Sequence, residues 1–197
     1  MDLRFAVMNS ATSSEPQVWD YQIGQENHPS YVAHIGYRVF PEFYLGMAYS
    51  AGPFLGEHPR ASIGRDGVDS HPQKIWEVEF LYERGKTQVR GEAFHDTWEV
   101  PNVDDYPVDV SGYVEIKQKF LTGLYGALRY GTMRFNEIRL SSGEWAAWDF
   151  DIWRWQAALG YRIRRNLDVR AEYMFNHTAG PSDPRDNLLS LQCRFEF

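Results

Sequence analysis

Ten segments of the chain alternate apolar and polar residues with a period of two. This spacing is typical of a β-strand with one apolar face, because successive side chains of a strand point to opposite sides. The segments span residues 3–9, 30–40, 43–51, 74–83, 87–99, 108–120, 123–134, 149–163, 166–177 and 187–197. No comparable stretch has the spacing of an amphipathic helix, so the pattern predicts an all-β protein.

The connections between these segments alternate between short and long. The short ones contain Pro, Gly or Asn, which favour tight turns, and they lie at residues 40–43, 83–86, 120–123 and 164–167. The long ones are rich in Pro, Gly, Ser, Asp and Trp and lie at residues 10–29, 52–73, 100–107, 135–148 and 178–186. This alternation gathers the turns at one end of the strands and the loops at the other, which predicts antiparallel strands in up-and-down order.

The final segment carries apolar residues at every second position and ends on an aromatic residue. In this pattern the chain resembles the outer-membrane β-barrel proteins of Gram-negative bacteria, porins among them, whose closing strand commonly ends in Phe. The resemblance implies a location in the bacterial outer membrane. It also implies a membrane insertion signal that the barrel-assembly machinery reads, formed by Leu189, Leu191, Phe195 and Phe197.

The resemblance implies an antiparallel up-and-down transmembrane β-barrel with about ten strands in this chain. Residues 1–197 would form a single barrel domain or the C-terminal part of a larger one. The composition is compatible with this fold, since 16% of the residues are aromatic. The mean hydropathy of -0.51 does not exclude it, because only every second strand residue of a barrel faces lipid.

The chain enters its first predicted strand directly, through Leu3, Phe5 and Val7, and shows no secretory signal. An outer-membrane protein requires such a signal for export. We therefore expect the chain to be the C-terminal portion of a larger porin-like protein, with a trimmed sequence or a misplaced gene start as alternatives.

The two phases of the alternation differ in their chemistry. One phase is almost uncharged, as in Trp76, Val78 and Phe80, and its aromatic residues gather near strand ends, as the girdles of a membrane barrel require. A soluble barrel shows the same alternation with its apolar face inside. The aromatic strand ends and the asymmetry of the connections favour lipid outside and charge inside. Gln118 and His95 also fall on the apolar phase, and we expect them near a rim.

The charged phase repeats an Arg-x-Glu element on three segments, at 90–92, 170–172 and 194–196. At similar depth in one lumen, these pairs would form a ladder of alternating signs across neighbouring strands. Such a lumen is either a hydrated pathway with fixed charges or a set of ion pairs that fills the barrel. The residues expected to line the pore are Arg90, Glu92, Glu115, Lys117, Arg129, Arg154, Arg170, Glu172 and Arg194.

The net charge of -7 lies in the long connections, which hold twelve acidic residues against four arginines. This balance argues against nucleic acid as a partner, because phosphate binding requires clustered Lys and Arg. The best positions for a divalent ion are Asp104 with Asp105 and Asp149 with Asp151, but neither pair has the spacing of a calcium loop. We interpret these pairs as solvated acidic loops and expect neither a metal site nor a cofactor.

Catalytic patterns are absent from the sequence. The six histidines lie mostly in loops or at loop ends, no Gly-x-Ser-x-Gly element occurs, and no glycine-rich phosphate loop is present. The single cysteine, Cys193, lies on the apolar phase, where a small hydrophobic residue suffices. We therefore expect no enzymatic activity.

Together these patterns predict a porin-like outer-membrane channel for passive or selective passage of small hydrophilic solutes through a charged lumen. The expected partners are outer-membrane lipids, the barrel-assembly machinery and the solute, with a homo-oligomer left open. Two alternatives remain. One is a complete small barrel with a structural or adhesive role, acting through acidic, aromatic loops such as residues 144–151. The other is a soluble ligand-binding β-barrel.

Overall fold

The computed structural model describes residues 1–8, 29–54, 71–101, 105–140, 142–181 and 186–196. No helix in this described part is long and apolar enough to cross a membrane. The strands are β1 (Asp2–Met8), β2 (Ser30–Phe40), β3 (Phe43–Pro53), β4 (Pro72–Arg84), β5 (Thr87–Trp98), β6 (Val108–Lys119), β7 (Leu124–Phe135), β8 (Glu137–Arg139), β9 (Trp145–Ala147), β10 (Ile152–Arg164), β11 (Leu167–Thr178) and β12 (Leu188–Phe195).

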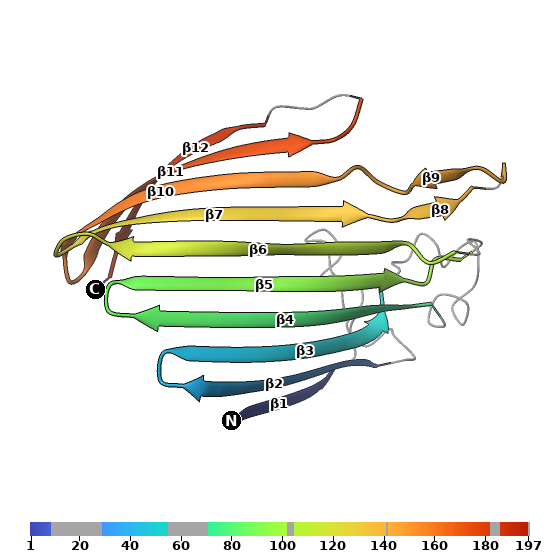
Figure 1. Ribbon diagram of the computed structural model, residues 1–197, viewed down its shortest axis with the longest axis horizontal. Helices are drawn as coiled ribbons and strands as arrows, with labels where there is room; N and C mark the ends of the chain where they lie inside the picture. Colours follow the sequence, from blue (N-terminus) through green and yellow to red (C-terminus); the bar gives the residue numbers. More distant parts are fainter. Residues whose placement is uncertain (9–28, 55–70, 102–104, 141, 182–185, 197) are drawn as a thin grey trace.

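Ten of these strands form one antiparallel sheet in which each strand pairs with its neighbours along the chain, in the order β1-β2-β3-β4-β5-β6-β7-β10-β11-β12. The turns after β2, β4, β6 and β10 lie at one end of the strands, which we call the turn rim, and the opposite end is the loop rim (Figure 1). The predicted up-and-down order is confirmed. In the β4–β5 turn, Gly85 has a φ of 61°, a conformation that residues with a side chain rarely adopt.

The ten predicted strands are confirmed, and their ends lie within three residues of the observed ones. Residues 135–148 form a long connection between β7 and β10, as predicted, but it contains two strands that the sequence pattern does not indicate. Within it, β8 and β9 pair as a separate two-stranded sheet, which extends beyond the loop rim of the main sheet (Figure 1). These strands have three residues each, too few for a period of two to be recognised.

The register of the sheet places the apolar phase on one face. Ile35 lies opposite Met47, Met47 opposite Val78, and Val78 opposite Ala93. Because side chains alternate along every strand, every second residue counted from these four lies on the same face of the sheet. We call this the apolar face and the opposite one the polar face.

In the middle of β4, apolar residues are more exposed than the charged residues beside them, the opposite of what a soluble protein shows. On β4, Trp76 and Val78 are 51% and 43% exposed, whereas Glu77 and Glu79 beside them are only half-exposed or less. A contiguous exposed apolar surface of this extent is typical of contact with a membrane or another protein. The exposed apolar residues thus lie on one face, and hollows lined by charged side chains lie on the other.

The sheet remains open at both sides. Within the described residues, β1 pairs only with β2, and β12 pairs only with β11. In hydrocarbon, unpaired backbone N–H and C=O groups are too costly to persist. A membrane-spanning form of this sheet therefore requires a hydrogen-bonded partner at each of these two edges.

Candidate functional site

The polar face brings together all nine residues that the sequence predicts as pore-lining. Arg90, Glu115 and Arg129 are direct neighbours in one rung across β5, β6 and β7. Glu92 and Arg154 lie in the adjacent rung toward the loop rim. The four others lie on the same face toward the turn rim: Lys117, Arg170, Glu172 and Arg194.

Glu115 lies between two arginines in the middle of the polar face. Its Oε1 accepts a hydrogen bond from Arg90 Nε at 2.9 Å, and its Oε2 is 2.8 Å from Arg129 Nη2. The Glu115 side chain is only 14% exposed, so it loses most of its hydration. Two guanidinium groups offset that loss, and the three side chains form a short ladder of alternating charge.

Tyr113 extends this ladder toward the loop rim. The Arg129 guanidinium lies 4.2 Å from the centre of the Tyr113 ring, a cation–π distance. The Tyr113 hydroxyl donates a hydrogen bond to Glu92 Oε1 at 2.6 Å. Glu92 therefore forms its hydrogen bond with a tyrosine on the neighbouring strand β6 and not with Arg90 on its own strand.

The three Arg-x-Glu elements do not lie at one depth, so the condition for a ladder across all three is not met. The rung that contains Arg90 reaches β11 at Met174, four residues from Arg170. The stagger between neighbouring strands thus shifts Arg170 toward the turn rim. Its guanidinium pairs along β11 with Glu172, at 3.3 Å between Nη2 and Oε2.

A cavity of about 280 Å³ opens on the polar face between β5 and β11. Six of the nine predicted residues line it: Arg90, Glu115, Lys117, Arg129, Arg170 and Glu172. Of the others, Arg154 Nε donates to Asn176 Oδ1 at 2.5 Å, and Arg194 contacts Glu196 near the turn rim. The cavity walls are charged and the Gln156 side chain joins Glu172 at 3.2 Å, so the space is suited to water and polar solutes.

Sequence reasoning missed a second polar group on β2 to β5. Glu79 Oε1 lies 2.8 Å from His34 Nε2 and accepts a hydrogen bond from the Tyr44 hydroxyl at 3.1 Å. Carboxylate oxygens of Glu77, Glu79 and Glu92 lie within 4.8 Å of one another. Such oxygens could hold a divalent cation, and His34 and Tyr44 already bind one of them. The alternation placed Glu77 and Glu79 on the charged phase, but only the register brings His34 to them.

The loop-rim end of the polar face carries a buried polar and aromatic cluster that the sequence analysis also missed. Asp96 and Asp109 are directly paired across β5 and β6 and are 8% and 4% exposed. Gln73 Nε2 donates to Asp96 Oδ2 at 2.5 Å, and Trp98 Nε1 donates to Asp109 Oδ2 at 3.3 Å. The Trp98 ring packs edge-on against Trp148, with centres 6.3 Å apart. This cluster therefore buries polar and aromatic side chains together at one end of the polar face.

The described carboxylates of the acidic loop pairs bind backbone N–H groups. Asp105, Asp149 and Asp151 each accept a hydrogen bond from a backbone N–H, at 2.8, 2.7 and 3.0 Å. Asp104 lies outside the described residues. Asp149 thus binds the next residue along the chain, whereas Asp105 and Asp151 each connect a loop to the backbone of a strand, β8 and β7.

Three of the four residues of the expected insertion signal are exposed on the apolar face. Leu189, Leu191 and Phe195 are 68%, 79% and 55% exposed, and Phe197 lies outside the described residues. They continue the apolar rungs of β11, where Leu191 lies opposite Ala171.

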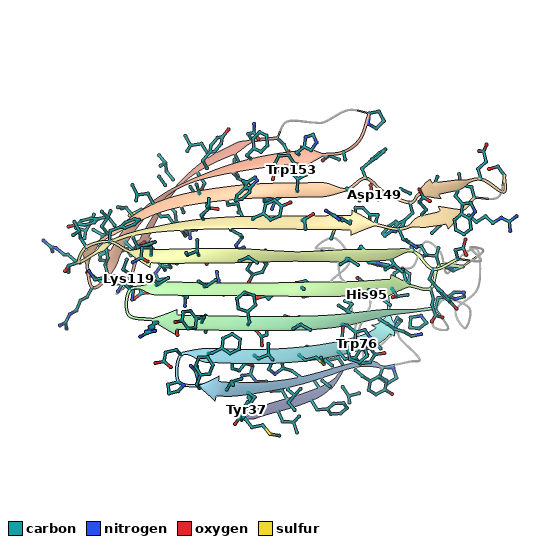
Figure 2. The ribbon with its side chains drawn as sticks, in the orientation of Figure 1. Tyr37, Trp76, His95, Lys119, Asp149 and Trp153 are labelled. Carbon is teal, nitrogen blue, oxygen red and sulfur yellow. The ribbon has the colours of Figure 1, made fainter. Side chains whose placement is uncertain are left out.

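Aromatic residues of the apolar face lie toward both rims. Figure 2 shows Tyr37 toward the turn rim and Trp76 and Trp153 toward the loop rim. The two polar residues on this phase lie near rims as well. His95 is on the loop-rim side of β5 (Figure 2), and Gln118 comes one residue before the end of β6. This distribution matches the girdles of membrane barrels.

No family model and no curated protein matches the chain. Solved structures with a similar fold include the outer-membrane protein OmpT of Vibrio cholerae and its variant that lacks loop L8. The variant superposes with a TM-score of 0.60 at 14% identity over 87% of this chain and 55% of its own. The parent protein superposes with a TM-score of 0.60 at 12% identity, over 87% of this chain and 57% of its own. The chain therefore has the fold of an outer-membrane β-barrel protein and spans about half the length of these structures.

Proposed function

We propose that this chain forms the wall of a porin-like outer-membrane channel that passes small hydrophilic solutes along its charged face. One observation carries the proposal: the apolar face is exposed, and the opposite face is charged and hollowed by the cavity that Arg90, Glu115 and Arg129 line. Lipid satisfies the first face and water the second. A soluble barrel would require the reverse arrangement.

The fold supports the location and the partners of this proposal. Outer-membrane lipids would cover the apolar face, and the barrel-assembly machinery would read the apolar strand β12 (Leu188–Phe195). Closure of the channel would come from hydrogen bonding at the free edges of β1 and β12, either within one barrel or between copies of the chain. The function needs neither a cofactor nor a catalytic group.

The experiment that tests the proposal uses two neighbouring residues of β7. Ala127 lines the cavity of the polar face, and Leu128 is on the apolar face with 45% exposure. Each is changed to cysteine in a Cys193→Ala background, and the refolded protein is studied in planar lipid bilayers. A bulky, membrane-impermeant thiol reagent is added to the water phase. We expect single-channel steps that the reagent reduces in the Ala127→Cys protein and leaves unchanged in the Leu128→Cys protein.

Other results would overturn the proposal. A folded protein without conductance would argue for a filled barrel. Reduction of the current in the Leu128→Cys protein and none in the Ala127→Cys protein would place the aqueous path on the wrong face. The background protein without either cysteine controls for direct action of the reagent on the bilayer.

A structural or adhesive role is the second candidate, and the β8–β9 hairpin favours it. The hairpin projects beyond the loop rim (Figure 1), and Trp145 on it is 61% exposed. Leu140 and Phe150 beside it are 42% and 48% exposed. Deletion of residues 137–147 should abolish adhesion to a surface if this role holds, and it should leave conductance in place if the channel proposal holds.

A further inference from the structure

A second hollow lies on the polar face at the turn rim, between the β6–β7 and β10–β11 turns and the end of β12. Its volume is about 620 Å³, within the range of sites that hold small ligands. Two carboxylates line it, those of Asp168 and Glu196. Six cationic side chains line it as well: Lys117, Lys119, Arg162, Arg165, Arg170 and Arg194. We call this hollow the cationic basin.

The carboxylates of the basin are already engaged. Asp168 Oδ1 accepts a hydrogen bond from the Tyr125 hydroxyl at 3.0 Å. Glu196 contacts Arg194 on its own strand, and Glu172 just outside the basin pairs with Arg170. Glu196 and Glu172 therefore pair with two of the six cations, and Asp168, opposite Arg162 on β10, keeps its negative charge. The six cations still outnumber these three carboxylates.

Three of the remaining cations have no such partner. In the part of the chain that the structure describes, the side chains of Lys119, Arg162 and Arg165 make neither an ion pair nor a side-chain hydrogen bond, and all three are exposed. Figure 2 shows Lys119 at the turn rim. Like charges gathered around one hollow repel each other, and a bound anion removes that repulsion. A guanidinium group can bind two oxygens of one carboxylate or phosphate group through two parallel hydrogen bonds. The binding therefore selects for the geometry of the anion as well as for its charge.

The position of the basin favours a dissolved anion over a lipid headgroup. The basin opens on the polar face, whereas lipid would cover the opposite face, where Leu191 and Leu159 are exposed. Its lining also includes Thr122, Asn166 and Gln192, whose polar groups suit the uncharged part of a solute.

We propose that the cationic basin binds small solutes that carry phosphate or carboxylate groups with at least two negative charges. This inference rests on the proposed channel and deepens it, because it names the class of solute. Binding would concentrate the anion at the turn rim, next to the cavity where Arg170 and Lys117 line both spaces.

Calorimetric titration with inorganic pyrophosphate tests the inference on the full chain refolded in nonionic detergent. The test protein carries Lys119→Gln, Arg162→Gln and Arg165→Gln. The matched control carries Arg4→Gln, Arg38→Gln and Arg84→Gln on β1, β2 and β4, which removes the same charge from positions outside the basin. We expect the basin variant to bind pyrophosphate at least tenfold more weakly than the unchanged chain and the control variant to differ from it by less than about twofold.

The two variants distinguish binding in the basin from general attraction of an anion to a charged protein. Equal weakening in both variants would mean general electrostatic attraction and would overturn the inference, as would the absence of pyrophosphate binding. A second variant, with Lys119→Arg, Arg162→Lys and Arg165→Lys, keeps the charge and should retain binding. All variants are checked for the heat-modifiable gel mobility of a folded barrel. Since this experiment measures no current, failure of binding leaves the channel proposal standing, and absence of conductance with binding intact rejects only the channel.

The same titration in lipid nanodiscs distinguishes the source of the anion. At a salt concentration that screens the surface potential of the anionic lipid, nanodiscs of phosphatidylcholine with and without phosphatidylglycerol should give equal pyrophosphate affinity if the basin takes a dissolved anion. Weaker binding in the presence of phosphatidylglycerol would show that a lipid headgroup occupies the basin, and it would overturn the assignment to a solute.

Discussion

Glycines on the polar face make room for large side chains of the neighbouring strand. A Cβ atom on Gly160 would lie 2.2 Å from Cζ of Tyr125, and one on Gly36 would lie 2.0 Å from the hydroxyl of Tyr44. Both tyrosines hold hydrogen bonds of the polar face, Tyr125 to Asp168 and Tyr44 to Glu79. The close approach of ring and backbone therefore helps to set the shape of the hollows.

Gly160→Ala should force the Tyr125 ring to move and break its hydrogen bond to Asp168. We expect a loss of about 1–2 kcal/mol in the free energy of unfolding, measured by urea titration of the protein in detergent. Gly131→Ala is the matched control, because the nearest atom to its Cβ would be 3.6 Å away. An equal loss in the two variants would contradict the packing described for Tyr125.

Glu115→Gln should leave Arg90 and Arg129 without the carboxylate that separates them. The free energy of unfolding should fall by roughly 1–3 kcal/mol, because two charged groups lose their partner. Glu144→Gln, at an exposed position of the β8–β9 connection, should change it by less than about 0.5 kcal/mol. If Glu115→Gln proved neutral in the same urea titration, the ladder would have no stabilising role.

The sequence predicts the face of each of these residues but not its partners. Alternation alone placed Glu79 and Arg90 on the charged phase. His34 and Glu79 are 45 positions apart, and only the register of β2, β3 and β4 shows that they meet. The stagger that separates Arg170 from the rung of Arg90 follows from the same register, which a single sequence does not contain.

Among the elements, the long strands were predictable because their pattern is strong. Each predicted main strand has at least seven residues and alternates throughout, and the turns carry Gly, Pro or Asn. The β8–β9 hairpin is too short for such a signal. Its turn is held by a hydrogen bond from Leu140 N–H to Glu144 C=O at 2.8 Å and includes Gly143, whose φ is positive. The loop-rim cluster of Trp98 and Trp148 depends on this hairpin and was missed with it.

The exposed apolar face predicts a cost for charge that depends on depth in the membrane. Val114 lies in the middle of β6 and Val39 near the turn rim, and they are 51% and 50% exposed. Val114→Arg should destabilise the protein in lipid vesicles by about 2–4 kcal/mol, and Val39→Arg by about 0–1 kcal/mol. Urea unfolding monitored by tryptophan fluorescence measures both, and equal costs at the two positions would contradict a membrane around this face.

At the scale of the whole molecule, the sheet is a curved wall with opposite chemistry on its two faces and free edges at β1 and β12. Two faces of opposite chemistry are compatible with the low mean hydropathy, because only every second strand residue belongs to the apolar face. The long connections carry the acidic residues, whereas the turn rim gathers the cationic ones of the basin.

The reversal potential of the proposed channel under a salt gradient tests the central claim most directly, since it would report whether the polar face meets the permeating ions. The unchanged protein is compared with Arg129→Glu, which inverts a charge in the cavity, and with Arg139→Glu on the projecting hairpin as a control. We predict that Arg129→Glu shifts the reversal potential toward cation preference and that Arg139→Glu changes it much less. The same reversal potential in all three proteins would contradict a channel lined by this face.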